Sequence, residues 1–330
     1  MGRVFVCGDT HGSLDILKLT GRYWPCGRTL NREDLLVILG DFGLVWSREP
    51  SRDETFWLDW LEARPWTTLF VDGNHENHDL LDAIEVSLWR SGEVHRLCGH
   101  PHIIHLMRGQ VYECGEAGRW FVFGGARSQD AQWRTPGRSW WSREMPSAQE
   151  YAKGWERLSE VGFSVDYVFT HDTTSSRLSL AMPWYERHPD HVPPTDELTD
   201  YLESVDAALD ADRLKAWYCG HYHLDRTLGD ARHVLLYQQV VELGRAPTVV
   251  GAPGVFVPGV GYSVGTHVEG LEEAARLAQA TVDEAAHFLG VDAHGCDLVF
   301  SHEDVVGLRR HVDAARKSEL MRLGPKADIS

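Results

Sequence analysis

Potential metal ligands follow directly after several short apolar runs of this 330-residue chain. Their side chains combine carboxylate and amide oxygens with imidazoles and contain no thiolate, a mixture that suits Mn²⁺, Fe or Zn²⁺ rather than a structural zinc cage. The residues concerned are Asp9 and His11 after VFVC, Asp41 after LLVIL, Asn74 after TLFV, His171 after YVF, and His221 and His223 after AWYC. Seven ligands exceed the needs of one ion, whereas a carboxylate such as Asp41 can bridge two. Two ions about 4 Å apart activate water and hold a phosphoryl group.

The elements that must position these ligands are strands and helices in alternation. Short apolar runs followed by Gly or Asp alternate with amphipathic stretches, which is typical of an α/β fold. The runs span residues 4–7, 35–39, 68–71, 120–123, 167–169 and 216–219. Residues 51–63 and 195–209 are expected to be helices, the second opening in a capped turn at Thr195. Ligands gather beyond the carboxyl ends of strands in α/β sheets, so these distant residues can converge.

Five short motifs occur in one order, each behind an apolar run. They are GDTHG (8–12), GD (40–41), GNHE (73–76), the lone His171 and GHYH (220–223). Each motif alone is weak, but the ordered set resembles the calcineurin-like metallophosphoesterase superfamily over about residues 3–240. The resemblance implies two mixed β-sheets packed as a sandwich and flanked by helices.

The resemblance also implies a dinuclear metal centre and a phosphoester hydrolase. The implied ligands are Asp9, His11, Asp41 and His223 for one ion and Asp41, Asn74, His171 and His221 for the other. We expect two divalent ions, Mn²⁺ first, with Fe or Zn²⁺ as alternatives. His75 matches the histidine that contacts phosphate and protonates the leaving group, while a hydroxide between the metals attacks phosphorus in line. The expected substrate is a small or nucleotide-like phosphomonoester or phosphodiester.

One motif departs from the protein Ser/Thr phosphatases, which GDTHG and GNHE otherwise resemble. Their second motif, GD-x-x-DRG, is here GDFGLVW (40–46). Leu44 stands in place of an aspartate that would orient the catalytic histidine, and Val45 in place of an arginine that would grip phosphate. A protein phosphatase is therefore disfavoured. Glu76 or Asp172 is expected to orient the histidine instead, and the sequence leaves this choice open.

Other residues near the motifs have competing interpretations. Arg127, which follows the WFVF run, and Asn74 are candidates for contacting the substrate phosphate, but Arg127 is equally well explained as a surface residue. The GHPH motif (99–102) precedes its apolar run, so its histidines are expected at the wrong end of a strand for metal binding. The histidines excluded in this way are His95, His100, His102 and His105. Trp140 and Trp141 are candidates for stacking on a substrate or for packing.

The charge composition limits the classes of substrate and partner that the chain is expected to bind. The formal net charge is −17, with 32 Lys and Arg against 49 Asp and Glu, so the mean field repels polyphosphate backbones and disfavours nucleic acid. A nuclease of short oligonucleotides stays an alternative because bound divalent metals reverse the field locally. A metal-loaded scaffold without turnover is the other alternative, although a scaffold has no need of His75. No residue pattern identifies a protein partner.

Two further features concern compartment and domains. The six cysteines are scattered without a CxxC pair, and no apolar run approaches the roughly 18 residues that span a bilayer. We therefore expect a cytoplasmic protein with reduced thiols and no membrane contact. A Gly- and Pro-rich connector, 251–265, is expected to join a catalytic domain, 1–250, to a small helical extension, 266–330. Alternatively, the connector completes the same domain as a loop and edge strand.

Overall fold

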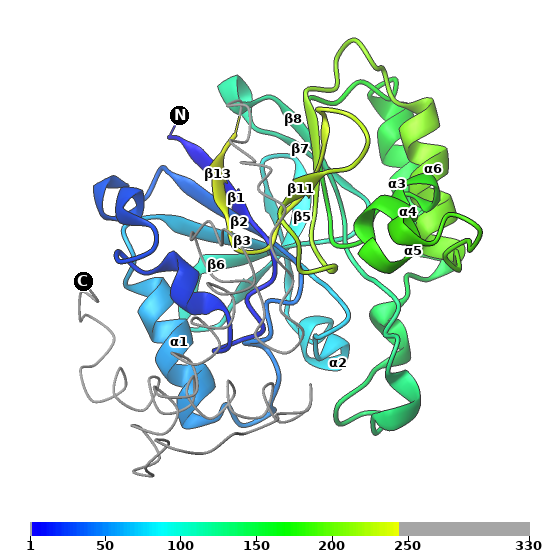
Figure 1. Ribbon diagram of the computed structural model, residues 1–330. Helices are drawn as coiled ribbons and strands as arrows, with labels where there is room; N and C mark the ends of the chain where they lie inside the picture. Colours follow the sequence, from blue (N-terminus) through cyan, green and yellow to red (C-terminus); the bar gives the residue numbers. More distant parts are fainter. Residues whose placement is uncertain (1, 244–330) are drawn as a thin grey trace, which may run out of the picture. The chain divides into compact units, whose positions relative to one another are not determined.

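Two mixed β-sheets lie at the centre of the computed structural model, which describes residues 2–243 (Figure 1). The first sheet has the strand order β13-β1-β2-β3-β6-β5-β4. Its strands are β1 (Val4–Cys7), β2 (Leu35–Leu39), β3 (Thr67–Val71), β4 (Val86–Trp89), β5 (Gly92–Leu97), β6 (His100–Leu106) and β13 (Val240–Glu242). The second sheet has the order β11-β12-β10-β9-β8-β7. Its strands are β7 (Gln110–Glu113), β8 (Arg119–Phe123), β9 (Tyr167–Thr170), β10 (Ala216–Cys219), β11 (Arg226–Thr227) and β12 (His233–Leu235).

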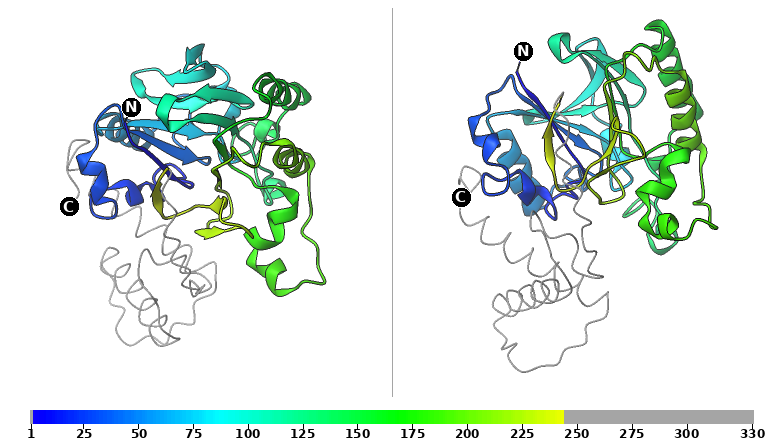
Figure 2. Two further views of the ribbon diagram at one scale, coloured as in Figure 1. Left: turned by 90° about the horizontal axis from the view of Figure 1, so that it is seen from above. Right: turned by 45° about the horizontal axis from the view of Figure 1, so that its top comes forward.

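Helices flank the two sheets. The α-helices of the described chain are α1 (Arg52–Glu62), α2 (His78–Leu81), α3 (Ala148–Glu160), α4 (Leu178–Ala181), α5 (Pro183–Arg187) and α6 (Glu197–Ala208). Short 3₁₀ helices are η1 (Ile16–Leu19), η2 (Pro25–Thr29), η3 (Gly115–Ala117), η4 (Ala131–Trp133), η5 (Ser142–Glu144) and η6 (Ser175–Arg177). Helices α3 to α6 gather beside the second sheet, as the green ribbons in Figure 2 show. The predicted α/β sandwich of two mixed sheets flanked by helices is confirmed.

The predicted strand segments are confirmed. Their continuous apolar runs form strands that are buried on both faces. All side chains of β1, β2 and β3 are buried, and the three strands pair in parallel in the order β1-β2-β3. Strands β8, β9 and β10 are also parallel neighbours. Parallel pairing places the carboxyl ends of neighbouring strands at one edge of a sheet. Each sheet therefore presents one row of loops in which ligands can gather.

The hydrophobic core has two parts. One fills the space between the two sheets, and the other lies between the second sheet and the helices that cover it. Val37 and Leu69 of the first sheet belong to one buried cluster with Val122 and Phe169 of the second. The alternate side chains of the second sheet face outward and pack under α3 and α6, as Trp217 does among the leucines of that layer. Because alternate residues of each strand enter different layers, both faces of the second sheet are apolar.

Both predicted long helices form, with one corrected cap. Ser51 caps α1 and forms a capping box with Glu54, as expected for a helix over 51–63. In the second helix, the cap is Asp196 rather than Thr195. The Asp196 carboxylate accepts hydrogen bonds from the amides of Leu198 and Thr199, both at 3.0 Å. A carboxylate placed one residue later reaches both amides, so the helix starts at Glu197.

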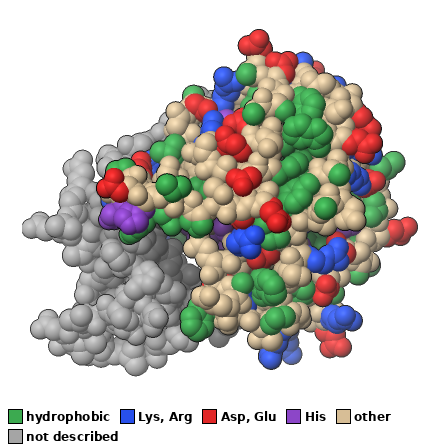
Figure 3. Space-filling model, turned by 90° about the vertical axis from the view of Figure 1, so that its right-hand side faces the viewer, with side chains coloured by type: hydrophobic (Ala, Val, Ile, Leu, Met, Phe, Trp, Pro, Cys, Tyr) green, Lys and Arg blue, Asp and Glu red, His purple; other side chains and the backbone are tan. Residues whose placement is uncertain are grey.

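Three observations bear on surface and boundaries. On the helical face in Figure 3, acidic and basic side chains are interspersed among hydrophobic ones. None of the helices that the structure describes combines the length and apolar character required to cross a bilayer. The five cysteines within residues 2–243 are free thiols. The expected connector 251–265 and extension 266–330 lie outside the described residues.

Candidate metal centre

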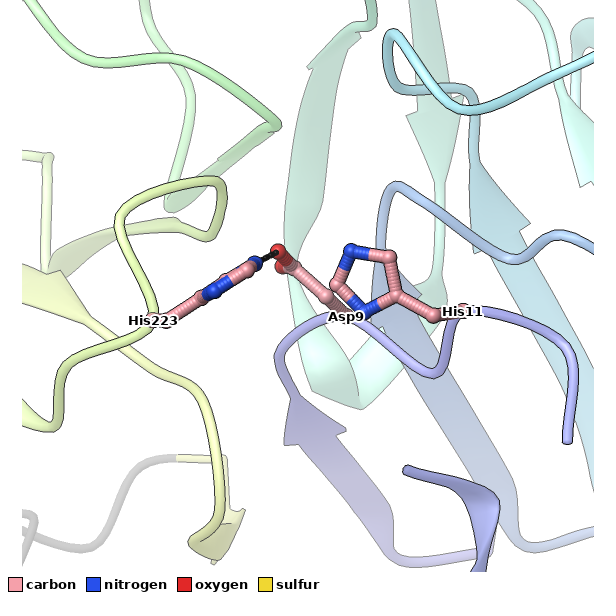
Figure 4. Close-up of side chains that lie close together, drawn as sticks. All are labelled: Asp9, His11 and His223. Carbon is pink, nitrogen blue, oxygen red and sulfur yellow. Dashed lines mark ion pairs between the residues drawn. The ribbon is translucent and has the colours of Figure 1, made fainter. Parts of the chain in front are cut away.

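The candidate ligands lie in the loops that follow strands of both sheets. Asp9 and His11 follow β1, and Asp41 follows β2. His171 follows β9, and His223 lies in the loop after β10. In Figure 4, the side chain of His223 reaches across to Asp9 and His11 from the opposite loop. The centre is therefore assembled where the strand ends of the two sheets face each other.

The side chains form three overlapping groups of possible ligands. Within each group, the ligand atoms all lie within 4.8 Å of one another. The groups are Asp9, His11 and His223; His11, Asp41 and His75; and Asp41, His171 and His221. Asn74 joins the third group because its Oδ1 lies 3.3 Å from Nε2 of His171. The structure thus brings together all seven predicted ligands and His75.

Asp41 lies at the junction of these groups. Its Oδ2 lies 3.1 Å from Nε2 of His11, and its Oδ1 lies 3.2 Å from Nε2 of His171. Its Oδ1 also accepts a hydrogen bond from the amide of His75 at 2.7 Å. The two oxygens of one carboxylate therefore face different histidines, as a carboxylate that bridges two ions must do.

The backbone of these loops is held in an uncommon conformation. His11, Asp41, His221 and His223 have φ values of 44°, 46°, 71° and 53°, in the left-handed region. Such residues cost about 1–3 kcal/mol each and persist where the surrounding structure fixes them. Four such positions in one cluster indicate that the loops are shaped for the site rather than for local stability.

The glycine of the GNHE motif allows close packing. A Cβ on Gly73 would lie 2.2 Å from Oδ1 of Asp41. The glycine of GHYH plays the same part, because a Cβ on Gly220 would lie 2.3 Å from Oδ1 of Asp9. Any side chain at either position would push a carboxylate out of the cluster. The glycines therefore belong to the geometry of the ligands.

Burial and mutual charge perturb the titration of these groups. Burial alone would raise the pKa of Asp41, but the charges of His171 and His11 outweigh it and hold this pKa well below its usual range. Burial alone would lower the pKa of His171, but the Asp41 carboxylate outweighs it and raises this pKa to about 10. Burial lowers the pKa of His221 to about 3. The Asp41 carboxylate thus stays ionised, and a cation bound beside it would displace the proton of His171.

The residues present fit two metal ions. Oδ2 of Asp9 is buried and makes no hydrogen bond, although Nε2 of His223 lies 3.2 Å away. A buried oxygen of this kind is costly unless a cation satisfies it. Two of the candidate histidines are also held through their other ring nitrogen: Nδ1 of His11 lies 2.8 Å from Oδ2 of Asp15, and Nδ1 of His171 lies 2.6 Å from the carbonyl of Leu39. Such partners leave Nε2 of each ring for a metal.

His75 is oriented by neither of the two residues that the sequence offered. The Glu76 carboxylate is buried and accepts hydrogen bonds from the amides of Phe42 and Gly43. The Asp172 carboxylate accepts hydrogen bonds from Tyr222 and from the amide of Thr173. Both expectations are therefore corrected: these carboxylates fix neighbouring loops.

Arg134 is the residue that faces His75, and no motif of the sequence marks it. Its Nη2 lies 2.8 Å from Nε2 of His75 and its Nη1 lies 3.3 Å from Nδ1. Its Nε is held by Asp130 at 2.8 Å, and its side chain is only 13% exposed. Burial is the main cause that lowers the pKa of His75 to about 4; the Asp41 carboxylate opposes it, and the charges of His11 and Arg134 add to it. A cationic guanidinium and a neutral imidazole therefore meet at one half-buried position.

Arg127 occupies a different environment. Its side chain is 56% exposed, and its Nε lies 3.2 Å from the Asp196 carboxylate at the start of α6. The next residue, Ser128, is the one that reaches the cluster, because its Oγ accepts a hydrogen bond from Nδ2 of Asn74 at 3.1 Å. Arg127 thus has a surface ion pair, as its alternative interpretation expects.

The excluded histidines lie elsewhere. None of the three groups of possible ligands among the described residues includes His95, His100, His102 or His105. His100 begins β6 and contacts Asp59 at 3.0 Å. Trp141 is buried, packs against Trp46 and donates a hydrogen bond to Asp79, which is a packing role.

Two facing sheets with His and Asp clusters between their strand ends define a class of metal-dependent enzymes. The chain belongs to the calcineurin-like phosphoesterase family, whose model matches residues 2–225. Family and clusters together identify a metallophosphoesterase, which hydrolyses phosphoester bonds. Among solved structures, the phosphopantetheinyl hydrolase from Mycobacterium tuberculosis is similar over 75% of this chain and 97% of its own, with 14% sequence identity and a TM-score of 0.38. No curated protein matches the chain in sequence.

Proposed function

We propose that this metallophosphoesterase hydrolyses a small or nucleotide-like phosphomonoester or phosphodiester at a two-metal centre. The observation that carries the proposal is the sharing of His11 and Asp41 between groups of possible ligands. The proposed ligands are Asp9, His11, Asp41 and His223 for one ion and Asp41, Asn74, His171 and His221 for the other. The mixture of carboxylate, amide and imidazole donors favours Mn²⁺, with Fe or Zn²⁺ as alternatives. When bound, the two ions supply an activated water and offset negative charge on the phosphoryl group.

Arg134 and His75 are proposed to bind the phosphoryl group from the side opposite the buried ligands. A guanidinium presents parallel N–H donors that match two oxygens of a phosphoryl group. Arg134 is fixed through its Nε by Asp130, and its two Nη atoms lie beside the ring nitrogens of His75. A neutral imidazole has only one acceptor nitrogen, so His75 cannot accept from both Nη atoms. An anion bound between Arg134 and His75 would accept hydrogen bonds from both side chains. It would therefore satisfy their hydrogen-bonding groups better than the two side chains satisfy each other's.

His75 is proposed to donate a proton to the departing oxygen, once the negative charge of the bound phosphoryl group has raised its lowered pKa. It is half-buried beside His11, with ring centroids 5.3 Å apart. Its amide is bound to Asp41, so its position is tied to the centre itself. A proton donor within reach of the leaving oxygen contributes about 10²- to 10⁴-fold to the rate. Arg134 thus takes the phosphate-binding part that sequence analysis gave to Arg127.

A substrate panel tests the proposal. Phosphomonoesters, cyclic nucleotides, dinucleotides and single-stranded oligonucleotides are assayed with the full chain loaded with Mn²⁺, Fe²⁺ or Zn²⁺. We expect turnover of at least one small phosphoester, with little dependence on salt, because a small substrate releases few counterions. Turnover restricted to oligonucleotides, with a steep loss at high salt, would identify a nuclease. No turnover of any phosphoester at full metal occupancy would identify a scaffold.

A further inference from the structure

The side chain of Asn74 is buried in the cluster, and its amide group has one defined orientation. Its Oδ1 lies 3.3 Å from Nε2 of His171, and its Nδ2 donates a hydrogen bond to Oγ of Ser128 at 3.1 Å. Only the amide oxygen has lone pairs that a metal can use. The two ends of the amide have nearly the same shape, so packing alone does not select between them. A half-turn of the amide would replace a ligand with two N–H groups.

The hydrogen bonds of Ser128 supply that selection. Ser128 donates to Glu144 twice, from its amide to Oε1 at 2.9 Å and from its hydroxyl to Oε2 at 2.5 Å. Ser128 and Glu144 are 6% and 2% exposed, so water does not compete for these bonds. A carboxylate only accepts, and the Ser128 hydroxyl has only one proton. This oxygen can therefore only accept from Asn74, which turns the Nδ2 of Asn74 toward Ser128.

Glu144 is itself held in place. Its backbone carbonyl accepts a hydrogen bond from Nη2 of Arg108 at 3.1 Å. Arg108 in turn forms a buried ion pair with Asp72, in which its Nε lies 2.7 Å from Oδ2. Asp72 follows β3 and precedes Asn74 by two residues. The relay from Glu144 to Asn74 is thus closed into a ring of buried contacts, so neither end can move alone.

We propose that Glu144 and Ser128 are positioning residues that set the direction of the Asn74 amide and so keep its Oδ1 available to a metal ion. The proposal rests on the proposed function in taking Asn74 as a ligand. Neither Glu144 nor Ser128 belongs to a motif of the sequence. Partners of this kind, which touch a ligand and not the metal, change metal affinity by about 10- to 100-fold when they are altered.

Glu144→Gln tests the direction of the relay by changing one atom. The Ser128 amide must still donate, so the new amide oxygen accepts from it and the new NH₂ group faces Oγ of Ser128. The hydroxyl proton of Ser128 then has no acceptor unless the Asn74 amide turns, so that Oδ1 of Asn74 accepts it. We expect one of two Mn²⁺ binding steps to weaken by about 10- to 100-fold in calorimetric titration of the metal-free full chain.

Matched variants assign the affected step. Glu144→Gln should weaken the step that His221→Ala weakens, and leave the step that His223→Ala weakens within about twofold of wild type. Equal affinities in wild type and Glu144→Gln would overturn the relay alone. Fewer than two Mn²⁺ ions bound by wild type would overturn the proposed function instead.

A second substitution separates orientation from general damage to the fold. Asn74→Asp offers an acceptor in either direction, so it should improve the weakened Mn²⁺ step more in the Glu144→Gln protein than in wild type, by about tenfold. An equal effect in both backgrounds would assign Glu144 a merely structural role and overturn the proposal. If Glu144→Gln does not fold, Ser128→Ala carries the test, because it also removes the acceptor for Nδ2 and should weaken the same step. An unchanged step in a folded Ser128→Ala protein would overturn the relay.

Discussion

Replacing Arg134 with Ala tests the phosphate-binding side of the site. The guanidinium presents two Nη atoms to the position beside His75, and its side chain is only 13% exposed. Each hydrogen bond to a charged partner contributes about 1.5–3 kcal/mol. Losing two such bonds removes about 3–6 kcal/mol. Because each 1.36 kcal/mol is tenfold in rate, we expect kcat/KM to fall by about 10²- to 10⁴-fold.

The assay is steady-state hydrolysis of p-nitrophenyl phosphate or its diester at full metal occupancy, with metal content measured on the same samples. Arg134→Lys keeps the charge but loses the paired donors, so it should recover only part of the lost rate. Arg127→Ala is the comparison within the same loop. Its exposed ion pair with Asp196 is worth about 0–1 kcal/mol, so its loss should stay below about fivefold.

Two results would refute the assignment. A kcat/KM of the Arg134→Ala protein within about fivefold of wild type, with both metals bound, would show that the guanidinium does not hold the phosphoryl group. A larger loss for Arg127→Ala than for Arg134→Ala would return the phosphate contact to Arg127. A loss of metal in Arg134→Ala would mean that the substitution disturbed the cluster, and Arg134→Lys would then decide.

Three further predictions concern the bridging carboxylate, the proposed proton donor and a buried core thiol. Asp41→Asn should lose both metals and all activity, because the two carboxylate oxygens face different histidines, whereas His100→Ala should keep both; elemental analysis and activity measure this. His75→Ala should keep its metals and lose about 10²- to 10⁴-fold on alkyl phosphoesters but far less on p-nitrophenyl esters, in a leaving-group series. Burial raises the pKa of Cys114 to about 12, while the unfolded thiol titrates near about 8.5. The free energy of unfolding should therefore fall as pH rises through this window, and less so in Cys114→Ser, in denaturant titrations at about pH 7 and about pH 10.

Each of these predictions has a contrary outcome. Metal retained in Asp41→Asn would remove the bridging role. Equal losses across the leaving-group series would leave His75 only a charge-stabilising or phosphate-positioning part, and lost metal would make it a ligand. The same pH dependence of the free energy of unfolding in wild type and Cys114→Ser would show that the thiol of Cys114 has the same pKa in the folded and the unfolded state.

Much of the fold could be predicted from the sequence because buried parallel strands appear in it as continuous apolar runs. The runs 35–39 and 216–219 coincide with β2 and β10, and potential ligands follow each. The edge strand β4 carried no such signal, because two of its four residues are exposed. Its partners are chosen by tertiary pairing, which no local pattern records.

The parts of the site that escaped prediction depend on contacts across the fold. Arg134 lies in no motif, and only its anchoring by Asp130 and the path of its loop bring it to His75. Glu144 and Ser128 are likewise ordinary residues until folding buries them beside Asn74. By contrast, Gly73 and Gly220 stand within the motifs that the sequence displays, although only the structure shows that a Cβ at either position would collide with Asp41 or Asp9. The sequence shows which residues a loop contains, whereas the tertiary fold determines which other residues those side chains contact.

Anomalous diffraction from crystals of the Mn²⁺-loaded full chain, recorded at the manganese edge, tests the two-metal centre most directly. The account predicts two peaks of anomalous density, one contacting Asp9 and His223 and the other contacting His171 and His221, with Asp41 contacting both. A single peak, or manganese bound at His100 instead of at these loops, would contradict it.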